Sequence, residues 1–385
     1  MLLPAREAAD RLGVKIDTLY AYVSRGLIRS REVAGSRERH YDASEIERFR
    51  AGRGATRARP PAEDLIPVIG SAICLIEDHR LYYRGKDAIS LAETASLEDV
   101  AALLWEEGTQ APTPILSRAR ERKQVGEDRG PLGIIERCQV RLAKLAAVDL
   151  AALDLSRAGV ARTGRVIVGA LTECLGAGES GVAAVHERLA VHWHLDPAGA
   201  DLVRRCLVLL ADHELNASTF VARCVASTAA TPYAVVAAAL AALSGRRHGG
   251  ASAQVEAMFR ELGDAEPMPA LAARLARGDA LPGLGQPLYP QGDPRALAII
   301  TALGEARPEA GRRVAATAVA AMELTGLVPN VDFALGAAAV ALGLPAGTAL
   351  GMFLVARAVG WIAHAIEQYE SGVLIRPRAR YTGRR

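Results

Sequence analysis

Aromatic residues are scarce in this chain, at 4% of its 385 residues, whereas apolar residues make up 50% and charged residues 23%. This composition excludes a disordered chain, because it supplies enough apolar surface for a large buried core. With few aromatic rings and much alanine and leucine, we expect a core of small side chains on closely packed helices. The length predicts two or three domains, at about 150 residues each.

Cysteine is also rare and forms no CxxC pair. The odd, scattered set excludes a disulfide framework or a zinc site and predicts reduced, buried thiols in a cytoplasmic protein. We expect no secretory signal, because Arg6 and Glu7 precede any apolar run. The five cysteines are Cys74, Cys138, Cys174, Cys206 and Cys224.

One uncharged run, at residues 333–356, is long enough to cross a bilayer. Residues 343–347 (GLPAG) interrupt it and predict a helix break, and the run is rich in alanine and glycine rather than leucine. We therefore expect two buried helices of a soluble protein rather than a membrane span.

The formal net charge of +3 predicts no particular partner, but the charge is unevenly distributed. Residues 1–60 hold 13 Lys and Arg against 8 Asp and Glu, whereas the remainder carries a net −2. A small basic head on a nearly neutral body indicates nucleic-acid binding.

The first fifty residues predict two short helices followed by a hairpin. Residues 4–13 end in a glycine that can close the first helix, and a second helix over about residues 18–24 can be capped by Asp17 and Thr18. Two extended pieces, at residues 28–33 and 39–41, should flank a turn, and a third helix should open at residue 42. The seam between the first two helices is expected to contain Ala8, Leu12, Leu19 and Val23.

Such an arrangement is a winged helix-turn-helix. The string AADRLGVKIDTLYAYVSRGLI, followed by SRERHY, resembles the MerR and excisionase-like family over about residues 1–53. The resemblance implies that the second helix enters a DNA major groove and that the wing at residues 37–39 touches phosphates. The alternative is a small folded head that binds protein, clamps a dimer or binds nothing. Candidate DNA contacts are Lys15, Thr18, Tyr20, Arg25, Arg37 and Arg39.

A Gly-, Pro- and Arg-rich stretch without apolar periodicity follows this head. It predicts a flexible linker at residues 54–64, so the head should fold alone. Beyond it the pattern is one helix after another, apart from a small hairpin predicted over residues 70–76 and 81–85. Helical spacing is clear at residues 100–105, 200–210, 233–243, 313–324 and 348–366.

Polar residues inside these apolar helices mark a candidate site. Arg357, Trp361 and His364 recur at i, i+4 and i+7, so one helix face carries a guanidinium group among apolar residues. A buried arginine needs an anion, and the three arginines Arg295, Arg357 and Arg376 suggest a ligand with more than one carboxylate.

Simpler structural readings exist for single residues. His213 could be a satisfied core histidine, and Asp332 could merely cap its helix. The Gly-Leu-Gly string at residues 283–285 is not a phosphate-binding loop, because it lacks the full glycine pattern of one.

Taken together, the motifs resemble the citrate synthase family over about residues 71–383. The matching strings occur in the family's order: YRG (83–85), DHE (212–214), HGGA (248–251), DPR (293–295), VDF (331–333), residues 357–364, and residues 376–383. The resemblance implies a mainly α, citrate synthase-like two-domain all-helical fold that forms an obligate homodimer. The large domain should span residues 65–227 and 325–385, and the small domain residues 228–324.

The implied reaction is the tricarboxylic acid cycle condensation of acetyl-CoA, or a related acyl-CoA, with oxaloacetate to give citrate and CoA. It needs no metal and no cofactor, since the coenzyme A thioester is a substrate. In the family pattern Asp332 removes the methyl proton, and His248 donates a hydrogen bond to the thioester oxygen. The remaining implied roles are dicarboxylate binding by His213, Arg295, Arg357 and a partner's Arg376, and CoA binding by Pro282, Gly283, Leu284, Gly285 and Leu288.

One catalytic position departs from the family. Gln286 stands where the family has a histidine that polarises the keto oxygen, so the string is GLGQPLY instead of GFGHPLY. A glutamine amide can donate a hydrogen bond but cannot carry a proton at neutral pH. Loss of a positioned acid typically costs ~10²–10⁴ in rate. In addition, Ser252 replaces an asparagine, and an Arg pair at residues 246–247 replaces a more apolar pair.

Three functions remain open from the sequence. The first is a citrate or 2-methylcitrate synthase, slowed or altered by Gln286. The second is a regulator whose body senses a dicarboxylate or acyl-CoA and controls the DNA-binding heads of a dimer. The third is a condensing or lyase enzyme for another keto acid, to which Gln286 is suited.

Overall fold

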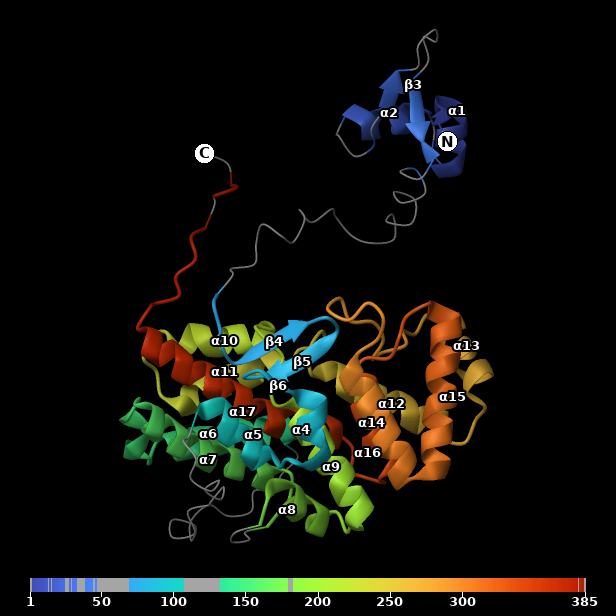
Figure 1. Cartoon of the computed structure of the whole chain (residues 1–385). Helices are drawn as coiled ribbons and strands as arrows, with labels where there is room; N and C mark the ends of the chain where they lie inside the picture. Colours follow the sequence, from blue (N-terminus) through green and yellow to red (C-terminus); the bar gives the residue numbers. More distant parts are fainter. Residues whose placement is uncertain are drawn as a thin grey trace. The chain divides into compact units, whose positions relative to one another are not determined.

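Packing contacts divide the computed structural model into two units, Met1–Val68 and Ile69–Arg385, shown in Figure 1. The structure describes residues 2–12, 14, 16–24, 28, 30–32, 39–43, 46, 69–106, 132–178, 183–379 and 381–383. The predicted linker at residues 54–64 lies outside these residues. The domain boundaries predicted within the body stay predictions.

The N-terminal unit contains the predicted helices and hairpin. Helix α1 (Ala5–Leu12) precedes α2 (Ile16–Ser24), which begins two residues before the expected start. Strands β2 (Ser30–Glu32) and β3 (Arg39–Asp42) pair in antiparallel fashion, and β1 (Leu2–Pro4), which was not expected, pairs with the other edge of β3. Ala8, Leu12 and Leu19 of the predicted seam are buried, and Val23 packs against them. The predicted third helix lies mostly outside the described residues.

The body opens with the predicted hairpin. Strands β4 (Cys74–Glu77) and β5 (Arg80–Tyr83) are antiparallel, and a further short strand, β6 (Lys86–Asp87), pairs with β5. The buried Tyr83 hydroxyl lies 3.1 Å from the Val208 carbonyl oxygen and 3.3 Å from that of Asp212. These contacts fix the sheet to the last turn of helix α9 (Pro197–Leu210) and to the chain that follows it.

The rest of the described body is almost entirely helical, as predicted. Besides α9, its helices are α4 (Ala88–Thr94), α5 (Leu97–Trp105), α6 (Ile134–Ala146), the short 3₁₀ helix η3 (Leu150–Leu153), α7 (Arg157–Cys174), α8 (Val185–His192), α10 (Ala217–Ala226), α11 (Pro232–Leu243), α12 (Gly250–Leu262), α13 (Pro267–Ala276), α14 (Pro294–Ala306), α15 (Pro308–Thr325), α16 (Val331–Ala341) and α17 (Thr348–Ser371).

Helix α17 forms the centre of the body and packs on helices that lie at both ends of the body. It is long and apolar enough to span a membrane, but its apolar segment is entirely buried within the fold, which makes it a core helix. The predicted break at residues 343–347 does separate α16 from α17, and Gly347 adopts the left-handed conformation there, with φ of 86°.

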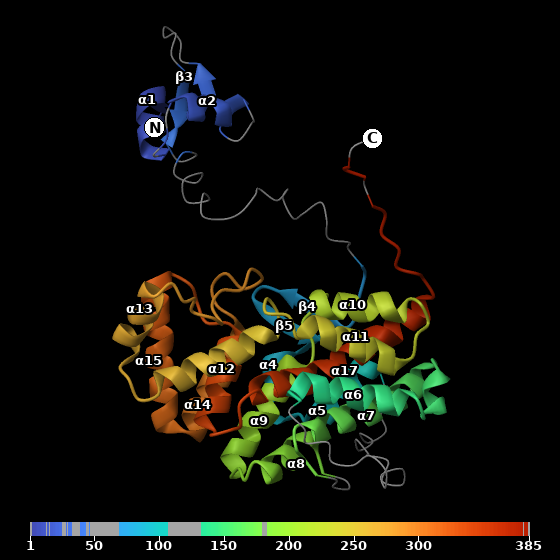
Figure 2. The ribbon, with the colours of Figure 1, turned by 180° about the vertical axis from the view of Figure 1, so that it is seen from behind.

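Helices α12 to α15 lie at one end of the body, with α6, α7, α10 and α11 at the other (Figures 1 and 2). Helix α11 falls within the predicted small domain yet packs on α6, α10 and α17. Helix α16, from the predicted large domain, packs on α12 and α14. The helices that carry Asp332 and Arg357, α16 and α17, are therefore among those through which the two predicted domains are in contact.

Candidate active site

The link between α9 and α10 brings His213 into the body's interior. The His213 Nε2 atom lies 3.1 Å from the Tyr289 hydroxyl. Burial holds the pKa of His213 well below its usual value, and the positive charges of Arg295 and Arg357 lower it further. His213 is therefore a neutral imidazole beside two guanidinium groups, and its contact with Tyr289 also fits the simpler reading of a satisfied core histidine.

Arg357 is a buried cation with an open hydrogen-bonding position. Only 1% of its surface is exposed, its guanidinium lies 4.9 Å from the Phe353 ring centre, and its Nε donates to the Leu210 carbonyl oxygen at 2.8 Å. Its Nη2 has no hydrogen-bond partner in the described part of the chain. Burial lowers the pKa of Arg357, and the nearby Asp212 carboxylate opposes that shift. An unpaired donor on a desolvated cation is a binding position for an anion.

Arg295, in contrast, already holds a carboxylate. Its Nε and Nη2 bind Asp293 Oδ1 and Oδ2 at 3.0 and 2.7 Å, and both side chains are buried. Burial alone would lower the pKa of Arg295, but Asp293 raises it above its usual value. The Val331 amide donates to the same Asp293 carboxylate at 3.1 Å. The fork of Arg295 is thus filled internally, and Nη1 is the nitrogen left for a ligand.

Asp332 lies in the first turn of α16 but does not cap it. Asn330 is the cap, because its Oδ1 accepts from the amides of Asp332 and Phe333 at 3.0 and 3.4 Å. The Asp332 carboxylate instead accepts a short hydrogen bond from the Ser252 hydroxyl. Burial raises the pKa of Asp332 to about 6, although Ser252 and Arg295 act to lower it. A carboxylate with this pKa is suited to act as a base near neutral pH.

His248 lies in the turn before α12, and its Nε2 is 2.7 Å from the Ser218 hydroxyl. That hydroxyl also lies 2.9 Å from Asn216 Oδ1 and accepts from the Trp361 indole at 3.3 Å. Burial, followed by the charge of Arg357, lowers the pKa of His248 to about 4. His248 is therefore neutral at physiological pH and can donate a hydrogen bond without carrying a charge.

The predicted CoA loop is fastened to the segment that leads to Asp332. The Gly283 carbonyl accepts from the Asn330 amide at 2.9 Å, and the Gly285 amide donates to the Val328 carbonyl at 2.7 Å. Gly283 has φ of 78°, and a Cβ there would lie 2.8 Å from the Phe333 amide nitrogen. In the same loop, Pro282, Leu284 and Gln286 are half-buried and Leu288 is exposed.

The structure brings the core of the predicted set together. The charges of Arg295 and Arg357 lower both the pKa of His213 and that of Asp332, so these four side chains belong to one group. Arg376 is exposed in the segment after α17, and its role in a partner subunit stays a prediction. No group of three or more His, Cys, Asp or Glu in the described ranges could hold a metal ion.

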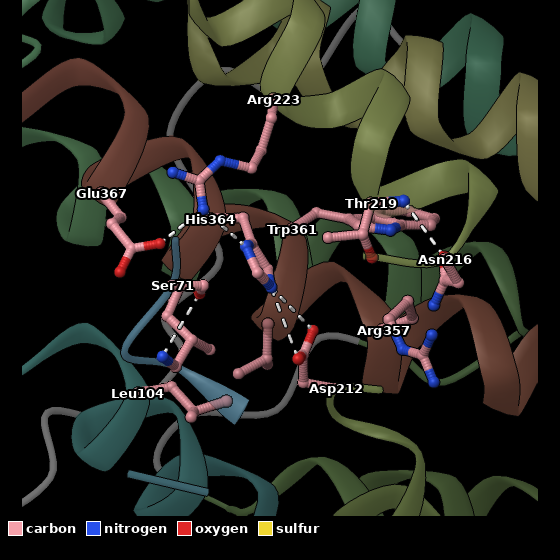
Figure 3. Close-up of polar contacts among 12 residues, drawn as sticks. Ser71, Leu104, Asp212, Asn216, Thr219, Arg223, Arg357, Trp361, His364 and Glu367 are labelled. Carbon is pink, nitrogen blue, oxygen red and sulfur yellow. Dashed lines mark hydrogen bonds and ion pairs between the residues drawn. The ribbon is translucent and has the colours of Figure 1, made fainter. Parts of the chain in front are cut away.

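A buried polar chain behind the site was not predicted. Asp212 lies 3.4 Å from His364 Nε2, and His364 Nδ1 lies 3.3 Å from Arg223, which pairs with Glu367 (Figure 3). Figure 3 also shows the Arg357 guanidinium on the other side of Asp212. The DHE string and the i, i+7 spacing named two members of this chain, but Arg223 had no distinguishing sequence feature.

Two of the six candidate DNA contacts can be placed. Tyr20 on α2 is 47% exposed, and the exposed Arg39 donates to the Ser30 hydroxyl at 3.0 Å. Lys15, Arg25 and Arg37 lie outside the described residues, as does the side chain of Thr18.

Comparison with known proteins agrees with both resemblances. A family model described as citrate synthase, C-terminal domain, matches residues 179–378, and one described as MerR HTH family regulatory protein matches residues 3–56. The citrate synthase of Mycolicibacterium smegmatis is 31% identical over 337 residues, which cover 80% of this chain and 90% of that protein. The chain belongs to the citrate synthase family.

Two other members of the citrate synthase family are similar to this chain over most of its length. The 2-methylcitrate synthase of Mycobacterium tuberculosis strain H37Rv is 32% identical over 338 residues, covering 80% of this chain and 86% of that protein. The crystal structure of citrate synthase from Pyrobaculum aerophilum matches with a TM-score of 0.65 and 26% identity, over 84% of this chain and 92% of that one. The chain spans about half the length of the curated relatives that it matches at 42% and 38% identity.

Proposed function

We propose that the body is a citrate synthase-type enzyme that condenses acetyl-CoA, or a related acyl-CoA, with oxaloacetate and then releases CoA by hydrolysis. The observation that carries this proposal is the buried Arg357 Nη2, which has no partner among the described residues and belongs to the same group of charges as Asp332. Relatives named citrate synthase and 2-methylcitrate synthase support the same reaction class. The reaction needs no metal or prosthetic group.

The dicarboxylate would bind chiefly to Arg357. Its open Nη2 and the remaining Nη1 of Arg295 supply two cationic donors, and neutral His213 supplies a third contact. Because Asp293 already neutralises Arg295, the first carboxylate gains most from Arg357. Arg376 of the partner subunit would complete the site in a cytoplasmic homodimer.

Proton transfer would begin at Asp332. Its carboxylate takes a proton from the methyl group next to the thioester, and the C–H electron pair forms an enolate whose oxygen accepts a hydrogen bond from His248. For His248 to donate from Nδ1, its Nε2 must accept a hydrogen bond from the Ser218 hydroxyl. That hydroxyl donates its one hydrogen to Asn216 Oδ1 at 2.9 Å, so it must turn toward Nε2, 2.7 Å away, when the thioester binds. The enolate carbon then attacks the keto carbon of oxaloacetate, and water cleaves the thioester.

Gln286 would contact the keto oxygen that gains negative charge in this attack. Its amide can stabilise that charge by donating a hydrogen bond, but the new alkoxide must take its proton from another donor. We therefore expect a turnover rate ~10²–10⁴-fold lower than that of a site with a histidine at this position.

Release of free CoA from acetyl-CoA and oxaloacetate tests the proposal. We expect measurable turnover by the full chain, an increase in Gln286→His, and loss in Asp332→Ala. The same assay with propionyl-CoA or other keto acids defines the substrate. Absence of CoA release with every such pair, at all pH values where the protein is folded, would overturn the proposal.

The MerR-type head favours a second function, in which the protein binds DNA and the body senses a ligand. The match over residues 3–56 supports a DNA-binding head, and Gln286 supports a catalytically weak body. No turnover, combined with low-micromolar oxaloacetate binding and a ligand-dependent change in DNA retention, would favour this function over catalysis.

A further inference from the structure

Ser252 forms a hydrogen bond with one oxygen of the Asp332 carboxylate. It lies in the first turn of α12, is fully buried, and donates its hydroxyl hydrogen to Asp332 Oδ1. The two residues are 80 positions apart in the chain, so the contact depends entirely on how α12 packs against α16.

Close packing of the two helices fixes this contact. Gly336 lies one turn after Asp332 on α16, and a Cβ there would be 2.7 Å from the Val255 side chain and 2.9 Å from the Glu256 amide nitrogen of α12. Val255 and Glu256 in turn lie one turn after Ser252. The helices thus touch through their backbones, which leaves the Ser252 hydroxyl little freedom to move away from Asp332.

His248 lies in the turn that leads into the same helix. Three residues separate His248 from Ser252, and the Ala251 amide donates to the His248 carbonyl at 2.8 Å. A movement of this turn would displace the thioester-binding imidazole and the Asp332 hydrogen bond together. Ser252 therefore links the position of the base to the position of the group that polarises the thioester.

We propose that Ser252 is a positioning residue for the proposed condensation: its hydroxyl fixes the Asp332 carboxylate by one oxygen and leaves the other, Oδ2, to receive the methyl proton. This inference rests on the proposed function. An anchored carboxylate cannot rotate, so its free oxygen keeps one orientation toward the thioester methyl group.

The other charges around Asp332 cannot replace this contact. Asp293, the N-cap of α14, and Arg295 in its first turn form a pair of their own, and Arg357 on α17 acts on Asp332 only through its charge. A hydroxyl that donates to the charged form of the carboxylate lowers its pKa. Removal of the Ser252 hydroxyl should therefore raise the pKa of Asp332 further above about 6.

Exchange of the acetyl-CoA methyl hydrogens with deuterated water isolates the step that Asp332 would perform. The full chain is mixed with acetyl-CoA and malate, a dicarboxylate without a keto group, and exchange is followed by mass spectrometry from pH 5 to 9. We expect the acidic limb of the exchange rate to move up by about one pH unit in Ser252→Ala. Ser252→Thr, which keeps the hydroxyl, should match the wild type.

Two further variants complete the design. Ser252→Cys keeps the side-chain volume, but its thiol is only a weak hydrogen-bond donor. The acidic limb of its exchange rate should therefore move in the same direction as that of Ser252→Ala, even if the alanine variant folds poorly. Ser227→Ala is the matched control, because the Ser227 hydroxyl donates to the Cys224 carbonyl at 2.7 Å in a turn after α10. Its limb should not move.

The outcomes separate the two proposals. Exchange in the wild type with an unchanged limb in both Ser252→Ala and Ser252→Cys overturns the role of Ser252 and leaves the proposed function intact. If the wild type shows no exchange at any pH, the proposed function fails. In that case the Asp332 carboxyl carbon is titrated by ¹³C NMR, assigned by its loss in Asp332→Asn. An unchanged pKa in Ser252→Ala then overturns the contact's role as well.

Discussion

The Gly360 amide donates a hydrogen bond of 3.1 Å to the Ala211 carbonyl oxygen, so the backbone of α17 lies directly against the chain that leaves α9. A Cβ at Gly360 would come within 2.4 Å of that oxygen and of Asp212 Oδ1. This close approach places Asp212 and His213 beside Arg357, three residues earlier on α17. The site thus depends on a glycine that lets two backbone segments approach closely.

Gly360→Ala should accordingly weaken both the fold and the site. Forcing a methyl group into this contact costs ~1–3 kcal/mol, because neither backbone can move without displacing its helix. We expect a lower melting temperature and weaker oxaloacetate binding, measured by thermal denaturation and calorimetry. Gly304→Ala on α14 is the control, since a Cβ there meets nothing within 4 Å. Equal behaviour of the two variants would contradict this account.

Much of this arrangement was predictable from local pattern. The spacing of Arg357, Trp361 and His364 predicted one face of α17, and the GLPAG string predicted where that helix begins. These features depend on neighbours in the chain, whose spacing a helix fixes.

Contacts between distant segments were not predictable. Nothing local indicates that Ser218 meets His248 across 30 positions or that Ser252 meets Asp332. Strand β1 was missed for the same reason, because three residues show no periodicity and their pairing with β3 is a tertiary event. The internal pairing of Arg295 with Asp293 also changes the role of the motif, since the sequence predicts Arg295 as an anion-binding residue whereas the fold largely neutralises its charge.

Substitution of the two buried arginines should have different effects on the protein. Arg295→Met leaves the fully buried Asp293 carboxylate without its partner, so we expect a loss of ~3–5 kcal/mol in the free energy of unfolding, measured with denaturant. The Val331 amide, which also donates to Asp293, cannot neutralise that charge. A loss below about 1 kcal/mol would show that Asp293 does not depend on Arg295.

Arg357→Met should act mainly on binding. Its Nη2 has no protein partner among the described residues, so the variant loses a donor to the ligand and only one hydrogen bond of the fold, that to Leu210. We expect oxaloacetate affinity to fall about 100-fold, which corresponds to ~2.7 kcal/mol. Calorimetry at matched pH measures this, and affinity within threefold of the wild type would place the dicarboxylate elsewhere.

Asp332 should make the protein less stable at the pH where it acts. Its pKa in the folded chain is about 6, above the ordinary 3.8, so the folded state holds a proton that the unfolded state has already released. Stability from this group is therefore fully present well below pH 3.8 and is lost as the pH rises through about 6. Asp332→Asn removes the penalty and should raise the free energy of unfolding at pH 7 by at most about 3 kcal/mol.

That gain should be nearly gone at pH 4, where wild-type Asp332 is protonated in the folded state and about half protonated in the unfolded state, while activity is absent at every pH. Denaturant titrations of both proteins at pH 4, 5, 6 and 7 follow the difference. A variant less stable than the wild type at pH 7 would mean that the ionised carboxylate is stabilised by its surroundings, against the direction of the shift.

The head should bind DNA with a strong dependence on salt. Each phosphate contact by an arginine releases counterions, so the slope of log affinity against log salt concentration reports the number of contacts. Arg39→Ala should reduce this slope by roughly 1 on a random duplex. Arg11→Ala is the matched control, because Arg11 is already paired with Glu7 at 3.0 Å. Gel retardation from low to physiological salt gives both slopes, and identical slopes for Arg39→Ala and the wild type would exclude the wing from phosphate contact.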